Sequence, residues 1–293
     1  MAYDCHGRRH SLFPGRSEMT EARSIIFSWD QDEAFDLLRS CDDDGILDVL
    51  QKYAPQGSCV LESGCGLARY VRYLTDRGWR CTGLEYRKET VNAVRRVWPD
   101  LEIVQGDVAA APFPDNSFDA VISLGVVEHF PEGPNRPLRE MLRVLKPGGV
   151  AIITVPCLNA IRRFKRRTGL AEVLALPRAL AAGIVKHQLR MPTRFRSAYK
   201  YAVYPAFGAF FEYRMTPAQF ASEVHAAGFE ILEHRPHAEL DGVYHDLNPF
   251  ELLIAFRRWK FYPTRLGLWI HEKLKRREFL CCHMQMIVAV ARK

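Results

Sequence analysis

Several patterns that would place this chain of 293 residues in a common class are missing from it. No uninterrupted apolar stretch is long enough to span a membrane, and the first residues, MAYDCHGRRHSLFPGR, hold no apolar run of the kind that a signal peptide needs. The eight cysteines form no C-x-x-C pair, which favours reduced, structural thiols over a cysteine metal site. We therefore expect a cytoplasmic protein. Its content of 48% hydrophobic and 26% charged residues predicts a globular fold with a substantial core.

Short continuous apolar runs such as AVISLGVV and VAIITV are typical of parallel strands that are buried on both faces. We predict strands near residues 59–62, 80–85, 101–105, 118–124 and 149–155, and helices near 67–76, 88–97 and 135–145. After an interruption, a helix (TPAQFASEVHAAG) and a strand (FEILEHR) follow, and an irregular, basic region at 237–280 precedes a last strand, MQMIVAVA. The fold class is therefore α/β, with a doubly wound, mostly parallel sheet.

The stretch from Cys59 to Glu85 has the form of a strand, a tight glycine turn, a helix and a second strand. A P-loop would need a Lys-Ser/Thr pair at the start of the helix, and none is present. A dinucleotide fingerprint that starts at Gly64 would need a third glycine where the chain has Arg69. Nucleoside triphosphates and dinucleotides are therefore disfavoured as ligands.

Acidic residues close three successive predicted strands: Glu62, Glu85 and Asp107. The carboxyl ends of parallel strands meet at one edge of a sheet, where Glu85 is placed to accept hydrogen bonds from the two hydroxyls of a ribose. Asp107 can accept from an adenine amino group while the backbone N–H of Val108 meets a ring nitrogen. These positions favour a ligand that carries an adenosine and an amino acid.

Four motifs, ESGCGLA, GLEYR, QGDVAAAPFPDNSFDAVISLGVVEHF and LRVLKPGGVAIITVP, occur in this order and resemble those of class I S-adenosylmethionine-dependent methyltransferases. The resemblance covers residues 59–156 well and 212–236 more loosely. It implies a Rossmann-like sheet of seven strands and S-adenosylmethionine as the cofactor. The expected segments are N-terminal helices (1–55), a cofactor-binding core (56–156), an inserted lid or substrate segment (157–213) and a C-terminal completion of the sheet with a basic, aromatic insertion (214–293).

The resemblance also implies which residues contact the cofactor. The methionine moiety falls on the turn from Glu62 to Gly66, the ribose on Glu85 and the adenine on Asp107 and Val108, while Leu124 and Gly125 line the methyl-donor side. The full set of expected cofactor residues is Glu62, Gly64, Cys65, Gly66, Glu85, Tyr86, Asp107, Val108, Leu124 and Gly125. The chain departs from the family pattern at Glu62, where Asp is more common, and at Ala68, where a third glycine is common.

Methyl transfer depends mainly on alignment, and a base is needed only where the acceptor must lose a proton. The candidate base is His129 in GVVEHF, since an imidazole titrates near neutrality. Glu128 is expected to orient His129 or to bind a backbone amide. The pair followed by proline resembles the quinone-biosynthesis O-methyltransferases. A divalent cation site would need an additional acid upstream in the same turn, but the residue four positions before His129 is Gly125. One carboxylate and one imidazole remain, and we expect no metal.

Positive charge gathers in one segment. Residues 157–200 carry eleven basic side chains and one acid, a net charge of +10 in a chain whose total is +7. An aromatic series follows: Phe195, Tyr199, Tyr201, Tyr204, Phe207, Phe210, Phe211 and Tyr213. By resemblance, 157–213 form a lid over the acceptor, which we expect to be a small molecule, partly apolar and partly anionic, such as a lipid-linked or glycan intermediate that is methylated on a hydroxyl or carboxyl.

Other uses of the basic segments stay open. They can be solvated helices, or they can contact an anionic membrane surface, with Trp259, Phe261, Tyr262 and Trp269 of the C-terminal tail as interfacial anchors. Nucleic acid ranks below a small molecule because no separate recognition domain is visible. RNA or protein methylation, and a regulatory protein that binds the cofactor without catalysis, are the alternative functions. The sequence leaves the oligomeric state open.

Overall fold

A computed structural model describes residues 38–42, 44–169, 198–204, 208–248, 251–257 and 260–293. Its centre is a sheet of seven strands in the order β3-β2-β1-β4-β5-β11-β8. The strands are β1 (Cys59–Ser63), β2 (Arg80–Glu85), β3 (Glu102–Gln105), β4 (Phe118–Leu124), β5 (Leu145–Pro156), β8 (Glu230–His237) and β11 (Met284–Val290). Neighbouring strands are parallel, except that β11 runs antiparallel to β5 and to β8. The predicted α/β class and the mostly parallel sheet are thus confirmed.

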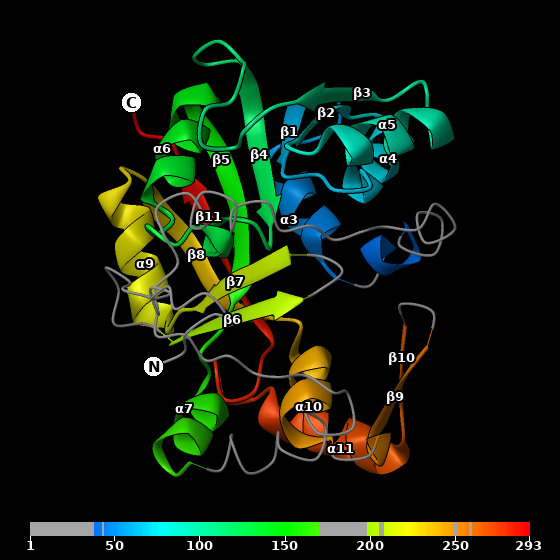
Figure 1. Cartoon of the computed structure of the whole chain (residues 1–293), viewed down its shortest axis with the longest axis vertical. Coiled ribbons are helices and arrows are strands. Elements are labelled where there is room, and N and C mark those ends of the chain that lie inside the picture. The colour runs from blue at the N-terminus through cyan, green and yellow to red at the C-terminus, as the bar shows by residue number, and fades with distance from the viewer. Residues whose placement is uncertain (1–37, 43, 170–197, 205–207, 249–250, 258–259) are drawn as a thin grey trace, which may run out of the picture.

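Helices cover both faces of the sheet, as Figure 1 shows. One face packs against α3 (Ile46–Tyr53), α4 (Arg69–Thr75) and α5 (Lys88–Val97), and the other against α6 (Asn135–Val144) and α9 (Pro217–Ala226). Successive strand residues alternate between the two cores: Val60 and Ile122 belong to the first, Leu61 and Val121 to the second. This alternation explains the continuous apolar runs in the sequence, because both faces of each strand are buried.

A lobe beside the sheet contains α7 (Ala160–Arg167), α10 (Glu239–Leu247), β9 (Ile254–Arg257), β10 (Lys260–Pro263) and α11 (Arg265–Leu274). We call these elements the C-terminal lobe, although α7 precedes the others by more than seventy residues. The lobe has a small apolar cluster of its own around Val243, Ile254 and Cys281. The expectation of an irregular region at 237–280 is therefore wrong: the described residues of this range form a helix, a pair of antiparallel strands and a second helix.

A buried ion pair joins α7 to α10. Arg162 donates from Nε to Asp246 Oδ1 at 2.9 Å and from Nη1 to the carbonyl of Cys157 at 2.8 Å, and both charged side chains are less than a tenth exposed. Asn159 caps α7 and also donates to Asp246. One arginine of the basic segment therefore has a structural role, because its buried guanidinium donates hydrogen bonds to several groups inside the lobe.

The inserted segment contributes a two-stranded antiparallel sheet, β6 (Ala198–Tyr204) and β7 (Gly208–Arg214), which lies against the loop after β4. Of the aromatic series predicted to line a pocket, Phe211 and Tyr213 are buried in the core. The other six members, and the basic residues from Arg178 to Lys200, lie outside the described side chains. Within the described ranges, no helix has the length and apolarity to cross a membrane.

Candidate active site

A pocket of about 880 Å³ opens at the carboxyl ends of the central strands. All ten predicted cofactor residues line it, and so does His129. The three acids meet there as expected: Glu62 from β1, Glu85 from β2 and Asp107 from the turn after β3. Parallel strands in register bring these distant residues to one edge of the sheet.

The glycine turn after β1 requires glycine at Gly64 for two reasons. Its φ of +84° lies in the left-handed region, and a Cβ there would meet the side chain of Val126 at 2.6 Å. The N–H groups of Gly64 and Cys65 both donate to the carbonyl of Leu84 at 2.9 Å, which ties the turn to β2. Ala68 also adopts a left-handed φ of 57°, the conformation that a glycine there would adopt without strain.

Glu62 and Glu85 accept hydrogen bonds from backbone N–H groups in and near the glycine turn. Glu62 accepts from the N–H of Val71 at 3.1 Å, and burial raises its pKa to about 8. Glu85 accepts from Gly66 at 3.1 Å with one oxygen and from Arg87 at 2.9 Å with the other, and burial raises its pKa too. A carboxylate oxygen can accept more than one hydrogen bond, so Glu85 retains the capacity to bind two ribose hydroxyls.

Arg69 lines the pocket beside the turn and donates to Ser40 Oγ at 2.6 Å. Among the described residues no carboxylate lies within ion-pair distance of it. The sequence interpretation used Arg69 only to argue against a dinucleotide and gave it no ligand. The sequence could have indicated that Arg69 lines the pocket. It lies three residues after Gly66, and the first turn of α4 must face the same edge of the sheet as the glycine turn.

His129 lies in a short 3₁₀ turn, η2 (Val127–His129), after β4. Its Nδ1 is 2.7 Å from the carbonyl of Phe211 on β7, and since a carbonyl can only accept, Nδ1 carries the proton. In the neutral ring the lone pair is then on Nε2. The inserted segment therefore fixes the tautomer of the candidate base.

Glu128 is not among the residues that line the pocket. It is 2% exposed, and its Oε2 has no hydrogen-bond partner within the described part of the chain. Burial, with the charge of Glu212 adding to it, raises the pKa of Glu128 well above its usual value. Its suggested role in orienting His129 stays a prediction, and the observed partner of His129 is the Phe211 carbonyl.

The C-terminal lobe supplies the opposite wall of the pocket, which the sequence interpretation missed. Asp241, Tyr244 and His245 come from α10, Phe256 from β9 and Phe261 from β10. The rings of Tyr244, Phe256 and Phe261 contact one another, with centroids 4.8–5.9 Å apart. Phe261, expected as a membrane anchor, thus faces the pocket, and no motif signalled it because the resemblance ends before residue 237.

Comparison with known proteins locates the family signal in the core. Residues 61–153 match the sequence model described as "Methyltransferase domain". A "Demethylmenaquinone methyltransferase" from Renibacterium salmoninarum is 37% identical over 101 residues, which is 34% of this chain and 42% of that protein. A "Fatty-acid O-methyltransferase" from Mycolicibacterium smegmatis is 40% identical over 103 residues, 34% of this chain and 37% of that protein. The chain thus matches less than half the length of these curated relatives.

Other matches include a relative that is named for a different substrate and a solved structure. A mouse protein named "Probable tRNA methyltransferase 9B" is 36% identical over 121 residues, 40% of this chain and 26% of that protein. The crystal structure of a SAM-dependent methyltransferase from Methanosarcina mazei aligns with a TM-score of 0.52 at 18% identity, over 83% of this chain and 96% of that one. At that identity the alignment shows the fold alone. The sequence resemblance and the expected fold are both confirmed.

Proposed function

The segment 61–153 is a methyltransferase domain of the S-adenosylmethionine-dependent type, and we propose that the whole chain is an enzyme that transfers a methyl group to a small molecule. The observation that carries the proposal is a single pocket with two unlike walls. The core wall presents carboxylates and a glycine turn, and the wall from the C-terminal lobe presents three aromatic rings. The two walls suit a polar donor and a partly apolar acceptor, respectively.

The residues of the core wall fit S-adenosylmethionine. Glu85 would bind the ribose hydroxyls, and Asp107 with the N–H of Val108 would bind the adenine, next to the exposed ring of Tyr86. Glycine at 64 and 66 lets the backbone approach the methionine moiety closely. Arg69 and Ser40 add a cation and a hydroxyl suited to the methionine carboxylate.

The cofactor, when bound, supplies a methyl group on a positively charged sulfur. The chain's own residues have to align the acceptor with that methyl and exclude water. His129, with its proton held on Nδ1 by the Phe211 carbonyl, presents Nε2 as the candidate base for a hydroxyl acceptor. An acceptor that needs no proton removal would leave His129 a shaping role only.

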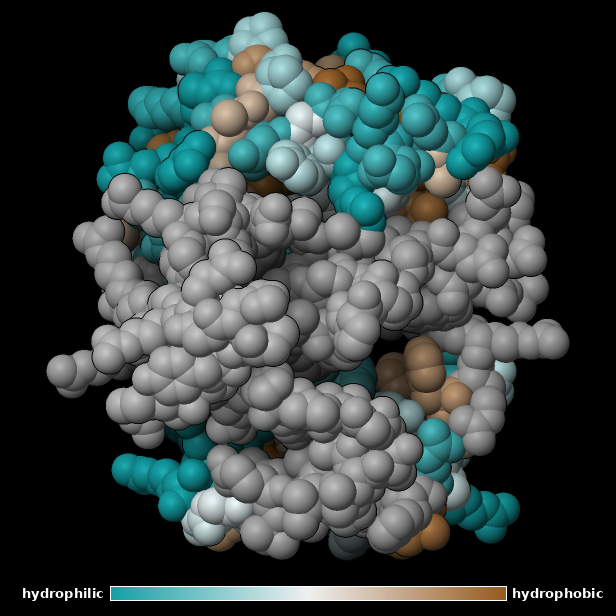
Figure 2. All heavy atoms as spheres, in the orientation of Figure 1, coloured by the Kyte–Doolittle hydropathy of each residue, from teal (hydrophilic) through white to brown (hydrophobic). Residues whose placement is uncertain are grey.

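The acceptor that we propose is partly apolar, with oxygen methylation at a hydroxyl or carboxyl. The aromatic wall supports the apolar part, and the two relatives that are named for a quinone and a fatty-acid substrate are consistent with it. A lipid-linked acceptor would also suit the outer surface of the C-terminal lobe, where large apolar side chains are exposed: Phe164, Leu252, Tyr262, Leu266, Leu268 and Trp269. In Figure 2 the described residues at the lower edge include both hydrophobic and hydrophilic side chains, and those of the upper part are mostly hydrophilic.

Exposed basic side chains belong to the same lobe, including Arg163, Arg166 and Arg167 on α7 and Lys273 on α11. Mixed basic and aromatic surfaces bind anionic membranes. We therefore include peripheral contact with an anionic membrane in the proposal, as the route by which an apolar acceptor would reach the pocket. RNA is the competing partner, because two matched relatives are named for tRNA.

Labelled cofactor tests the proposal. The protein is incubated with methyl-labelled S-adenosylmethionine and fractions of a host extract: lipid, small polar metabolite, RNA and protein. Label in the lipid or small-molecule fraction is expected. Label confined to the RNA or protein fraction would show that the substrate is RNA or protein and not a small molecule. Cofactor binding by calorimetry without label in any fraction would indicate a regulatory protein. His129→Gln is expected to lose transfer at unchanged cofactor affinity, whereas His225→Gln, on the exposed part of α9, should behave as wild type.

A further inference from the structure

A cluster of polar side chains lies where the C-terminal lobe meets the pocket. Asp241 and His245 come from α10, and His283 directly precedes β11. One nitrogen or oxygen from each lies within 4.8 Å of the others, a spacing that would suit a metal ion. Asp241 and His245 also line the pocket, and the function proposed above gives them no role.

Arg162 argues against a metal in this cluster. Its Nη2 is 2.8 Å from Nδ1 of His283, and because a guanidinium can only donate, Nδ1 is the acceptor. The neutral ring of His283 then carries its proton on Nε2, so neither nitrogen presents a lone pair to a cation. Arg162 is also fixed by Asp246 and by the carbonyl of Cys157. The buried guanidinium is therefore the cation that this cluster already contains.

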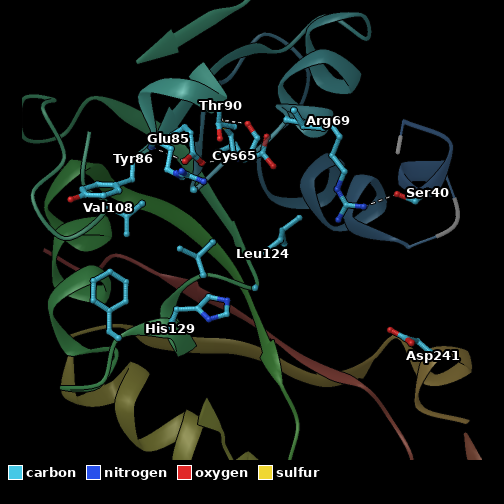
Figure 3. A pocket seen from close by; sticks show the side chains of 18 of the residues that line it. Ser40, Cys65, Arg69, Glu85, Tyr86, Thr90, Val108, Leu124, His129 and Asp241 are labelled. Atoms are coloured by element: carbon cyan, nitrogen blue, oxygen red, sulfur yellow. Dashed lines mark hydrogen bonds between the residues drawn. The ribbon is translucent and has the colours of Figure 1, made fainter. Parts of the chain in front are cut away.

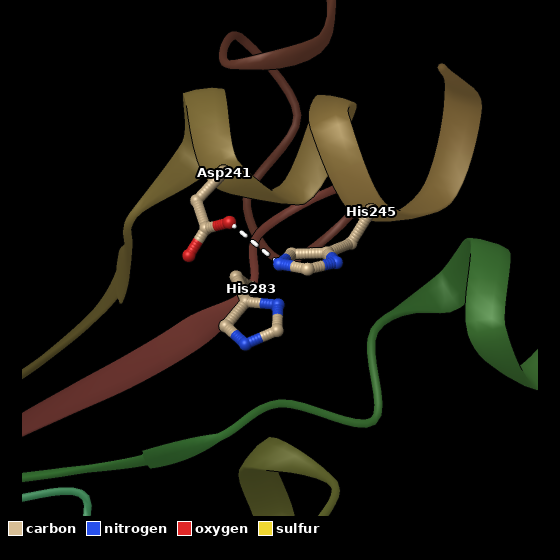
Figure 4. A group of neighbouring side chains, drawn as sticks. All are labelled: Asp241, His245 and His283. Atoms are coloured by element: carbon tan, nitrogen blue, oxygen red, sulfur yellow. Dashed lines mark ion pairs between the residues drawn. The ribbon is translucent and has the colours of Figure 1, made fainter. Parts of the chain in front are cut away.

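The remaining two residues form an ordered pair. His245 Nε2 is 3.0 Å from Asp241 Oδ1, the contact that is dashed in Figure 4. Burial opposes the charge of Asp241, but the hydrogen bond from His245 and the charge of the nearby Arg162 hold the pKa of Asp241 below its usual value. An ionised carboxylate only accepts, so in the neutral form of the imidazole the proton is on Nε2 and the lone pair is on Nδ1.

We propose that Asp241 and His245 form an acceptor subsite, in which His245 Nδ1 accepts a hydrogen bond from a hydroxyl of the substrate and Asp241 positions the imidazole. The aromatic wall of Tyr244, Phe256 and Phe261 holds the apolar body of the same molecule. The subsite thus selects an apolar compound that carries a hydroxyl, such as a phenol or a hydroquinone. The purpose of this subsite rests on the proposed function, but the binding of a ligand to it can be measured without turnover.

The place of the pair in the pocket supports this role. In Figure 3, Val108 and Tyr86 mark the side suited to adenine, and Glu85 the side suited to ribose. Asp241 and His129 lie beyond Leu124, on the side away from Glu85. A donor that occupies the core wall therefore leaves the region between His129 and the C-terminal lobe for the acceptor. A hydroxyl anchored at His245 would orient the acceptor relative to His129.

A matched pair of probes tests the subsite. 1-Naphthol has a hydroxyl donor and 1-methoxynaphthalene has the same rings without it, so the protein saturated with S-adenosylhomocysteine should bind the naphthol about tenfold more tightly, the effect of one hydrogen bond. In His245→Phe the ring remains without the acceptor nitrogen, and the two probes should bind equally. The exposed His225→Gln is the control and should keep the tenfold difference.

Asp241→Asn tests the positioning role. A neutral amide can donate to Nε2 as well as accept, so the tautomer of His245 is no longer fixed and the preference for naphthol should fall at least threefold, while cofactor affinity and melting temperature stay unchanged. Equal binding of both probes by the wild type, or an unchanged preference in His245→Phe, would overturn the subsite. Stoichiometric binding of Zn²⁺ that Asp241→Asn abolishes would overturn it in favour of a metal site. Failure of methyl transfer with naphthol selectivity intact would count against the proposed function alone.

Discussion

The two walls of the pocket differ in how the chain holds them in place. The core wall comes from strand ends whose position is fixed by the hydrogen bonds of a seven-stranded sheet. The opposite wall comes from α10 and the β9–β10 hairpin, which rest on a small apolar cluster and on the buried ion pair of Arg162 and Asp246. Donor geometry therefore depends on the sheet, and acceptor geometry depends on a few contacts of the C-terminal lobe.

Breaking the ion pair of the lobe should have the largest effect. In Asp246→Ala the guanidinium of Arg162 stays buried without its carboxylate, which typically costs about 3–5 kcal/mol of folding free energy. We expect urea unfolding to show that loss. Asp76→Ala removes the half-exposed partner of Arg72 on α4 and should cost less than about 1 kcal/mol. Equal losses in the two variants would contradict the view that the lobe depends on this pair.

Removing the central carboxylate of the core wall should abolish most cofactor affinity. Glu85→Ala loses the acceptor for the ribose and releases the N–H groups of Gly66 and Arg87, so binding should weaken at least about 100-fold, since hydrogen bonds to charged groups contribute roughly 1.5–3 kcal/mol each. Calorimetry with S-adenosylhomocysteine measures it. The exposed Glu89→Ala on α5 is the control, and wild-type affinity in Glu85→Ala would refute the assignment.

The steric need for glycine at position 64 can be tested separately from the need for a left-handed backbone conformation. Gly64 and Gly78 both have left-handed φ, +84° and +91°, but a Cβ at Gly64 meets Val126 whereas none of the described atoms lies within 4 Å at Gly78. Gly78→Ala should cost about 1–2 kcal/mol from strain alone. Gly64→Ala should cost a further 1–3 kcal/mol or so from overpacking. Thermal melts compare the two, and similar costs would show that Val126 yields easily.

The raised pKa of Glu62 predicts how stability depends on pH. The folded protein holds the proton up to about pH 8, whereas the unfolded chain loses it near 4.5. The folded state then binds more protons, so this contribution is complete at low pH and is lost as the pH rises through about 8. Glu62→Gln keeps an acceptor for Val71 and should become more stable than wild type as the pH rises. A difference that does not vary with pH would contradict the shift.

The smallest effect is expected at the outer surface of the lobe. Trp269 is 59% exposed, so Trp269→Ala should leave stability unchanged and weaken binding to phosphatidylglycerol vesicles about fivefold, on the order of 1 kcal/mol. Co-sedimentation at two salt concentrations measures it. Leu232→Ala, an exposed leucine on β8, is the control. Binding that is equal for both variants, or absent for the wild type, would remove the membrane from the proposal.

Much of the core could be predicted because its signals are local. Apolar runs placed β1, β2, β4 and β11 within a residue or two, and helix α5 fell at its predicted bounds, 88–97. Acids at the ends of successive strands predicted a shared site, because the carboxyl ends of parallel strands lie at the same edge of the sheet. The aromatic residues of the insert were harder: Phe211 and Tyr213 were read as pocket residues and are core, because spacing alone does not say which side of a hairpin faces the protein.

The sequence by itself determined the donor side: a glycine turn and acids after three strands suffice to predict a sheet edge suited to S-adenosylmethionine. Only the tertiary structure decided the opposite wall. Asp241, His245 and Phe261 are more than a hundred residues from His129, and no periodicity links them to it. The physical reason is that strand ends are ordered by the repeating hydrogen bonds of the sheet, whereas the lobe is placed by particular long-range contacts such as Arg162 with Asp246.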